Sequence, residues 1–172
     1  MAIINRVAEF HEDMTAWRRN LHMHPEICYE EVWTSDFIAE RLAEFGIETV
    51  RGLAGTGVVG ILKGKTDSGR AIGLRADMDG LPMPEANDFE HKSTTEGRMH
   101  ACGHDLHVTI GLGVAKIIKD LKLDFGTRII FQPAEEIASG ARWMIKDGAT
   151  NGLTYILGLH VYPDLSVGTI GI

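Results

Sequence analysis

The sequence has few cysteines, no run of basic residues and no long apolar stretch. Its 172 residues include only two cysteines, Cys28 and Cys102. Two cysteines could form one bridge, but they are too few for the disulfide framework of a small secreted protein, and we expect a reducing compartment. The N-terminus shows no signal peptide, and no apolar run approaches the length of a membrane span. We therefore expect a cytoplasmic protein without a membrane partner.

Positive charge is also scarce. Lys and Arg number 17 against 24 Asp and Glu, which gives a formal net charge of −7. A protein that binds nucleic acid needs a clustered excess of basic side chains to neutralise phosphates. The sequence therefore predicts no nucleic-acid partner. Its hydrophobic share of 44% and its length are ordinary for one globular domain with a sizeable core.

Apolar periodicity predicts an alternation of strands and helices. Helical spacing of apolar residues predicts helices over residues 5–21, 34–45, 108–121 and 138–146. Short apolar runs between turn residues predict strands over residues 47–50, 58–62, 71–76, 127–132, 155–161 and 167–172. Residues 85–100 lack periodicity and are expected to form a loop. This pattern is typical of the α/β class, and we expect a three-layer αβα sandwich with a mixed, mostly parallel central sheet.

The last predicted strand bears on the extent of the domain. Residues 167–172 are apolar, and neither a polar tail nor a closing helix follows them. Natural domains usually end in a polar surface segment. The ending therefore suggests that the sequence stops within a longer protein.

Four polar clusters each fall where a predicted strand ends or a loop begins. In open α/β sheets, ligands bind beyond the carboxyl ends of the strands. The first cluster follows the predicted strand 71–76 and contains Asp77 and Asp79. Two carboxylates at this spacing suit a metal site, although an Asp-x-Asp-Gly stretch is more often just a turn.

The second cluster carries the strongest signal. It holds three His, one Cys and one Asp within the eight residues 100–107. Cys102 and His104 can reach one metal ion or bridge two, because Gly103 permits a tight backbone bend. Asp105 could orient a ligating His through its other ring nitrogen, or it could simply cap the following helix. Packing does not account for so many ligating side chains, and we expect a metal site here.

The third and fourth clusters are weaker by themselves. Glu135 and Glu136 follow the predicted strand 127–132, where one carboxylate could bind a metal and the other act as general base on a metal-bound water. The alternative is a solvated pair that opens a helix. His160 closes an apolar strand, and a single such His is more often a core residue than a ligand. The interpretation of His160 as a ligand gains weight because the other clusters lack a further nitrogen ligand.

In their order along the chain, these clusters resemble the M20 metallopeptidase family. The resemblance is to its amidohydrolase branch of hippurate hydrolases, N-acyl-amino-acid amidohydrolases and auxin-conjugate hydrolases, and it covers essentially the whole chain. It is carried by Arg19-Asn20-Leu21-His22-Met23-His24-Pro25-Glu26, Leu74-Arg75-Ala76-Asp77-Met78-Asp79-Gly80-Leu81-Pro82, Met99-His100-Ala101-Cys102-Gly103-His104-Asp105, Phe131-Gln132-Pro133-Ala134-Glu135-Glu136 and Gly158-Leu159-His160-Val161.

The resemblance implies a zinc-exopeptidase-like catalytic domain and roles for individual residues. Glu135 would be the general base, and Asp77 would support the metal site. His107 would lie near it, whereas the segment 22–26 is a family marker without an assigned ligand role. The metal ligands would be Cys102, His104, Glu136 and His160.

The implied activity is hydrolysis of the amide bond of N-acyl amino acids, small molecules such as hippurate. Two divalent metal ions would activate a water molecule and stabilise the oxyanion. Glu135 would take the proton from this water and pass it to the leaving amine. The soft thiolate of Cys102 favours zinc, with manganese, cobalt or nickel as alternatives.

The resemblance also implies that residues 1–172 are only the N-terminal part of the catalytic domain. Family members continue into a smaller lid domain, used for dimerisation and substrate closure, and then return to the catalytic domain with a further His ligand. We expect the lid domain and the C-terminal catalytic segment to be absent here. The chain would hold four of five metal ligands, and the parent enzyme would be a homodimer through its lid.

Three alternatives stay open at this point. The first is a dipeptidase or aminopeptidase of the same family, although Cys102 and the Arg75-Ala76-Asp77 stretch favour the amidohydrolase branch. The second is a catalytically inactive metal-binding fragment. The third, a Cys-His enzyme with Cys102 as nucleophile, is weaker because no separate oxyanion or orienting groups are evident.

Overall fold

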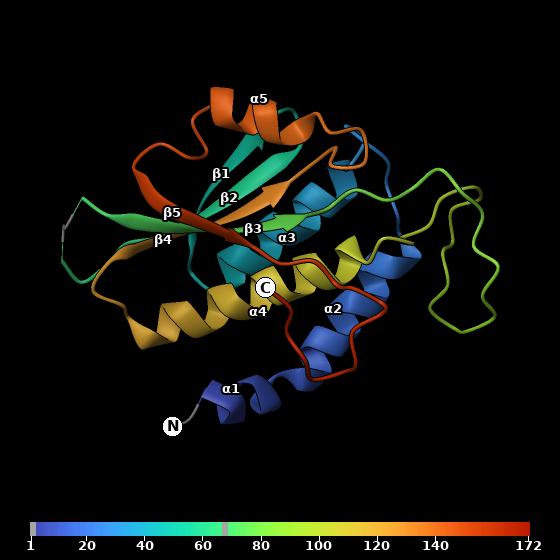
Figure 1. The fold of residues 1–172 in the computed structure, drawn as a ribbon, viewed down its shortest axis with the longest axis horizontal. Coiled ribbons are helices and arrows are strands. Elements are labelled where there is room, and N and C mark those ends of the chain that lie inside the picture. The colour runs from blue at the N-terminus through green and yellow to red at the C-terminus, as the bar shows by residue number, and fades with distance from the viewer. Residues whose placement is uncertain (1–2, 67–68) are drawn as a thin grey trace.

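A five-stranded sheet with helices on both faces forms the centre of the molecule (Figure 1). The structure, a computed structural model, describes residues 3–66 and 69–172. The strands are β1 (Glu48–Leu53), β2 (Gly57–Leu62), β3 (Ala71–Asp77), β4 (Gly126–Gln132) and β5 (Leu153–Gly158). The helices are α1 (Ile3–Glu9), α2 (His11–Met23), α3 (Val32–Glu44), α4 (His104–Leu121) and α5 (Gly140–Lys146).

The sheet is mixed, and its strand order is β1-β2-β4-β3-β5. β1 pairs antiparallel with β2, and β2 pairs antiparallel with β4. β3 lies between β4 and β5 and runs parallel to both. Every strand of the described sheet except β2 therefore points the same way, which confirms the expected α/β sandwich with a mixed, mostly parallel sheet. The same arrangement brings the carboxyl ends of β3, β4 and β5 to one edge.

Side-chain alternation along β4 explains why helices cover both faces of the sheet. Ile129 and Phe131 are fully buried in the larger core, which also contains Leu112 of α4. Ile130 belongs to a smaller core with Met144 of α5. Successive residues of a strand face opposite sides, so one strand supplies both cores. Figure 1 shows the result, with α5 on one side of the sheet and α2, α3 and α4 on the other.

The predicted helices exist, but their boundaries differ from the prediction. The helix expected over residues 5–21 is divided at Phe10, where the backbone has φ −122° and ψ 24°. The break buries the Phe10 side chain, and the Nζ of Lys116 lies 4.8 Å from its ring centroid. α4 begins at His104 instead of residue 108. Among residues 3–66 and 69–172, no helix is long and apolar enough to cross a bilayer.

The expected strand over residues 167–172 is wrong. This segment forms no strand, and Val167, Ile170 and Ile172 are exposed. Gly168 has φ 88°, in the left-handed region that a continuous strand does not use. An apolar segment becomes a strand only where its backbone groups find a neighbouring strand. The strand expected over residues 155–161 is present as β5, but it ends at Gly158.

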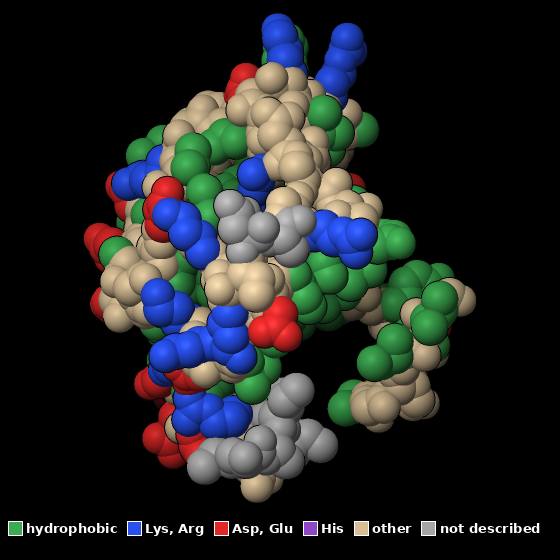
Figure 2. Space-filling view, turned by 90° about the vertical axis from the view of Figure 1, so that its left-hand side faces the viewer, with side chains coloured by type: hydrophobic (Ala, Val, Ile, Leu, Met, Phe, Trp, Pro, Cys, Tyr) green, Lys and Arg blue, Asp and Glu red, His purple; other side chains and the backbone are tan. Residues whose placement is uncertain are grey.

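The two ends of the sheet carry different polar side chains. At the amino ends of β3 and β4, Lys and Arg side chains gather on the face seen in Figure 2. Lys63, Lys65, Lys119 and Lys122 line a groove of about 430 Å³ there. The His-rich and carboxylate clusters lie at the opposite, carboxyl end, so the predicted chemistry is confined to one edge of the sheet.

The loop between β4 and α5 depends on a close backbone contact. Ala134 and Ala138 in this loop have φ values of 50° and 52°. At Gly140, the first residue of α5, an added Cβ would lie 1.6 Å from the carbonyl oxygen of Pro133. Only glycine leaves room for this approach. The contact shapes the loop that carries the two consecutive glutamates of the third cluster.

Replacing Gly140 with Ala should lower the free energy of unfolding by about 2–3 kcal/mol, because the new methyl group must displace the Pro133 carbonyl. Urea denaturation measures this change. Gly126→Ala is the matched control, since a Cβ at Gly126 meets its nearest neighbours only at 3.4 Å. Equal stability of the two variants would show that the contact at Pro133 is not restrictive.

Candidate metal centre

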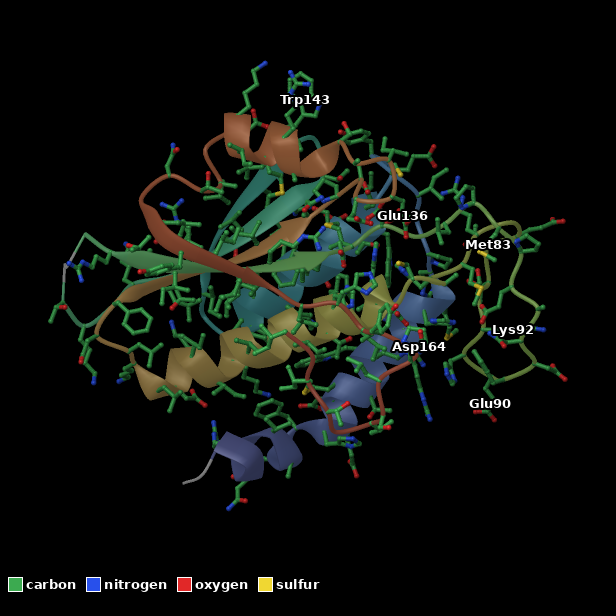
Figure 3. The ribbon with its side chains drawn as sticks, in the orientation of Figure 1. Met83, Glu90, Lys92, Glu136, Trp143 and Asp164 are labelled. Atoms are coloured by element: carbon green, nitrogen blue, oxygen red, sulfur yellow. The ribbon has the colours of Figure 1, made fainter. Side chains whose placement is uncertain are left out.

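The expected site residues meet at the carboxyl edge of the sheet. Asp77 is the last residue of β3, and His104 is the first residue of α4. Glu135 and Glu136 follow the end of β4. Figure 3 labels Glu136 at this edge, in the loop that leaves β4. Three segments that are far apart in the sequence therefore contribute to one site.

His104 lies at the centre of the site and is completely buried. Its Nδ1 lies 2.8 Å from the carbonyl oxygen of Asp79, so Nδ1 carries the hydrogen and Nε2 keeps its lone pair. Nε2 has no hydrogen-bond partner among the described residues. Carboxylate oxygens of Asp77, Glu135 and Glu136 lie 3.6, 3.7 and 3.8 Å from it.

These separations suit ligands that share a metal ion. They are too long for hydrogen bonds. Two oxygen or nitrogen ligands of one tetrahedral ion lie about 3.4 Å apart when each bond is about 2.1 Å long. Oε1 of Glu136 is also buried without a partner. Burial works to lower the pKa of His104, but the carboxylates of Asp79 and Asp77 outweigh it and raise this pKa, so the site favours positive charge at Nε2.

The potential ligand atoms form two groups that share His104. One group contains Cys102, His104 and Glu136, and the other contains Asp77, His104, His107 and His160, with the atoms of each group within 4.8 Å of one another. The single lone pair of His104, at Nε2, can bind one ion, so the two groups outline two adjoining positions of which His104 can serve one. The four residues expected as ligands are thus brought together, with His160 in the second group.

His160 lies beyond the end of β5, and its Nε2 is 3.3 Å from the Sγ of Cys102. The backbone N–H of the next residue, Val161, donates to Nε2 of His107 at 3.0 Å. Nδ1 of His107 donates to a carboxylate oxygen of Asp77 at 2.5 Å. Both nitrogens of His107 are therefore engaged. Its role in this structure is to hold the segment that carries His160, and no free lone pair is left for a metal.

Asp77 is kept ionised by its neighbours. A guanidinium nitrogen of Arg75 lies 2.5 Å from one carboxylate oxygen, and Nδ1 of His107 lies 2.5 Å from the other. Burial works to raise the pKa of Asp77, but the hydrogen bond from His107 and the charges of His104 and Arg75 lower it overall. Asp77 thus contributes negative charge to the site at neutral pH.

Two further carboxylates shape the loop after β4. Asp79 accepts a hydrogen bond from the backbone N–H of Glu136 at 3.0 Å. Glu31, fully buried, accepts hydrogen bonds from the backbone N–H of Ala134 at 2.9 Å and from the hydroxyl of Thr56 at 2.7 Å. Asp79 belongs to the first polar cluster of the sequence, whereas Glu31 was not expected at the site. A glutamate in a polar turn carries no local signal that it will be buried.

Cys102 and Glu136 hold their protons more tightly than in water. Burial, followed by the charge of Glu136, raises the pKa of the Cys102 thiol to about 11. Burial also raises the pKa of Glu136, against the attraction of His104. A cation among these side chains would lower both pKa values, because it stabilises a thiolate and a carboxylate.

Both Cys28 and Cys102 are free, so the single disulfide bridge that the sequence allowed is not formed.

A family model matches the part of the chain that carries these residues. The model described as Peptidase family M20/M25/M40 matches residues 73–172. All of the expected ligands and the expected general base lie within this span.

Two curated relatives and one solved structure are similar over nearly the whole chain. The N-acetylcysteine deacetylase of Bacillus subtilis is 44% identical over 166 residues, which are 95% of this chain and 43% of that protein. The N-acyl-L-amino acid amidohydrolase of Geobacillus stearothermophilus is 42% identical over 169 residues, which are 96% of this chain and 45% of that protein.

The solved structure is that of the Bacillus subtilis YXEP protein, described as a dinuclear metal binding peptidase from the M20 family. It superposes with a TM-score of 0.92 at 43% sequence identity, covering 96% of this chain and 47% of that one. The chain therefore spans less than half the length of each of these three proteins.

Replacing His107 with Asn should free the segment that holds His160. The Asn amide can still donate to Asp77, but it is too short to accept from the N–H of Val161. We expect a loss of about 1–3 kcal/mol in the free energy of unfolding, together with faster hydrogen exchange at the Val161 amide. The exposed His11 offers the control His11→Asn, which should change neither quantity. Unchanged exchange at Val161 would show that His107 does not hold this segment.

Proposed function

The chain belongs to peptidase family M20/M25/M40, and on that premise we propose that it carries the metal centre of a metal-dependent amidohydrolase. The proposed reaction is hydrolysis of the amide bond of N-acyl amino acids. One observation carries the proposal: Nε2 of His104 and Oε1 of Glu136 are buried, have no partner among the described residues and lie 3.8 Å apart. Buried polar atoms without partners are costly, and a cation bound to both would satisfy them.

The donor set supports two divalent ions. Two ions are proposed because the candidate ligands form two adjoining groups, with His104 available to one ion, and because the similar YXEP protein is described as dinuclear. When bound, divalent ions act as Lewis acids that lower the pKa of water and polarise a carbonyl group. The thiolate of Cys102 favours zinc, with manganese, cobalt or nickel as alternatives. The proposed ligands are Cys102, His104, Glu136 and His160.

Glu135 is the proposed general base. Its Oε2 lies 3.7 Å from Nε2 of His104, beside the proposed ligands. Its side chain is 37% exposed, compared with 17% for Glu136 and 0% for Asp77. Of the three carboxylates around His104, it is therefore the one best able to meet both a water molecule and a substrate. It would take a proton from the water and return it to the leaving amine.

Asp77 is proposed to support the metal centre from behind the residues that bind metal. It is buried, ionised and joined to His107, which holds the segment of His160. Its carboxylate would thus stabilise bound cations through charge and also maintain the position of a ligand. Such outer contacts typically orient the residues that bind a metal.

The substrate class rests on the names of the two curated relatives, both of which refer to N-acyl amino acids. Hippurate, whose acyl group is benzoyl, belongs to this class of substrates. A second candidate is a peptidase, because the similar YXEP protein is described as one.

We further propose that residues 1–172 are the N-terminal part of a catalytic domain in a longer cytoplasmic enzyme. The rest of that enzyme would add a further His ligand and a lid used for dimerisation.

Zinc should deprotonate one thiol near neutral pH. Without metal, the pKa values of Cys28 and Cys102 are both about 11, so both thiols are protonated. Binding to zinc converts a thiol to thiolate, and the ultraviolet absorbance should rise by one thiolate per chain. Cys28→Ser should leave this rise intact, whereas Cys102→Ser should abolish it. A rise that survives Cys102→Ser would remove Cys102 from the proposed ligands.

Glu135→Gln should abolish hydrolysis without loss of metal. The expected loss of rate is on the order of 10²- to 10⁴-fold, measured as amine released from N-acetyl and N-benzoyl amino acids by the zinc-loaded chain. Elemental analysis should show two metals per chain in wild type and in this variant, and fewer in Glu136→Gln. Glu90→Gln, in the exposed loop seen in Figure 3, is the matched control.

Each other outcome has a distinct meaning. Full activity of Glu135→Gln would contradict its role as base. Hydrolysis of dipeptides alone would favour the peptidase candidate. Metal binding by the wild-type chain without any hydrolysis would identify an inactive metal-binding fragment, and the activity would then be sought in a chain of the relatives' length.

A further inference from the structure

The segment His22-Met23-His24-Pro25-Glu26 has no part in the proposed reaction, yet His22 is almost completely buried. Its Nδ1 lies 2.7 Å from a carboxylate oxygen of Asp105, and its Nε2 lies 3.0 Å from a carboxylate oxygen of Glu85. The imidazole therefore bridges two buried carboxylates. One belongs to the first turn of α4, and the other to the long loop that precedes this helix.

Asp105 is completely buried and directly follows His104 in the sequence. Nε of Arg18 lies 2.9 Å from the oxygen that also receives the hydrogen bond of His22. Two positive groups of α2 thus face two carboxylates, so that the buried charges balance. Arg18 contributes charge, because its Nε lacks hydrogen-bond geometry, whereas His22 contributes the directed hydrogen bond.

Glu85 extends this contact into the loop. Its other oxygen accepts a hydrogen bond from the backbone N–H of Ser93 at 2.6 Å. The N–H of Thr94 donates to the carbonyl of Met23, at the end of α2, at 2.9 Å. The base of the loop is thus attached to α2. Its tip also reaches this helix, because His91, between Glu90 and Lys92 labelled in Figure 3, has its Nε2 3.2 Å from Nη1 of Arg18.

The first turn of α4 has no side-chain cap, so buried contacts of its own side chains hold it in place. Its N-cap is Gly103, with φ 86° and no side-chain capping hydrogen bond. A helix that begins without such a cap lacks one of the usual restraints on its first turn. Cys102 and His104 flank this glycine. His104 is held on the side of the sheet by the carbonyl of Asp79, whereas Asp105 ties the same turn to α2.

We propose that His22 is a positioning residue for the metal centre, which by bridging Asp105 and Glu85 holds the first turn of α4 and thereby Cys102 and His104. The proposal rests on the proposed function, because it concerns the affinity of those residues for metal. It gives the segment 22–26 a physical role at a site from which its side chains are otherwise separate.

Titration of the metal-free chain with Co²⁺ tests this role, with the thiolate-to-cobalt absorbance as readout. His22→Asn keeps a donor for Asp105 and loses Glu85, whereas His22→Gln keeps a donor for Glu85 and loses Asp105. We expect His22→Gln to raise the Kd for Co²⁺ by on the order of 10- to 100-fold, the usual effect of removing a contact behind a ligand. His22→Asn should raise it less.

His24→Asn is the matched control, because Nδ1 of His24 contacts only the carbonyl of Asn20 among the hydrogen bonds of the described chain. It should leave the Kd unchanged. Urea unfolding of each metal-free variant separates stability from positioning. A merely structural His22 would lower the unfolding midpoint and leave the Kd of the folded chain as it is.

Equal Kd values for wild type and both His22 variants would overturn the proposal. Absence of Co²⁺ binding by the wild-type chain would instead refute the metal centre itself. Should both His22 variants unfold, Glu85→Gln weakens the same bridge from the loop side and must raise the Kd. An unchanged Kd in that variant would also overturn the proposal.

Discussion

The structure depends on the convergence of three carboxylates on one buried imidazole. Oxygens of Asp77, Glu135 and Glu136 lie within 3.6–3.8 Å of Nε2 of His104. Like charges held this closely repel one another strongly where water is scarce. The arrangement is favourable only with positive charge at its centre, supplied by a proton on His104 or by a bound cation. The surrounding fold holds these side chains in place against their repulsion.

The two buried histidines behind the site have one feature in common: each forms hydrogen bonds through both of its ring nitrogens. His107 joins Asp77 to Val161, and His22 joins Asp105 to Glu85. Buried polar groups must find partners, so each such residue ties two distant segments together. These ties explain how loops, which are usually mobile, can hold several ligating groups in a fixed arrangement.

Much of the fold could be predicted from local pattern. Short apolar runs identified all five strands of the described sheet. Burial on both faces explains this signal in β2 and β4, whereas β5 is apolar although largely exposed. The failures concern long-range contacts. Residues 167–172 are apolar but have no partner strand in the described chain. The helix expected over residues 5–21 breaks so that Phe10 can be buried, a choice made by its neighbours in space and not by its own periodicity.

By itself, the sequence determined which chemical groups are present and where along the chain they cluster. The density of ligating side chains in residues 100–107 was enough to propose Cys102 and His104 as ligands, whereas Glu136 and His160 were assigned through the resemblance to the M20 family. Only the tertiary structure decided which groups are free to bind metal and which are occupied. It engaged both nitrogens of His107, buried Glu31 under the loop after β4, and placed His22 behind α4. These roles depend on hydrogen bonds between residues far apart in the chain, and no local pattern of residues records such bonds.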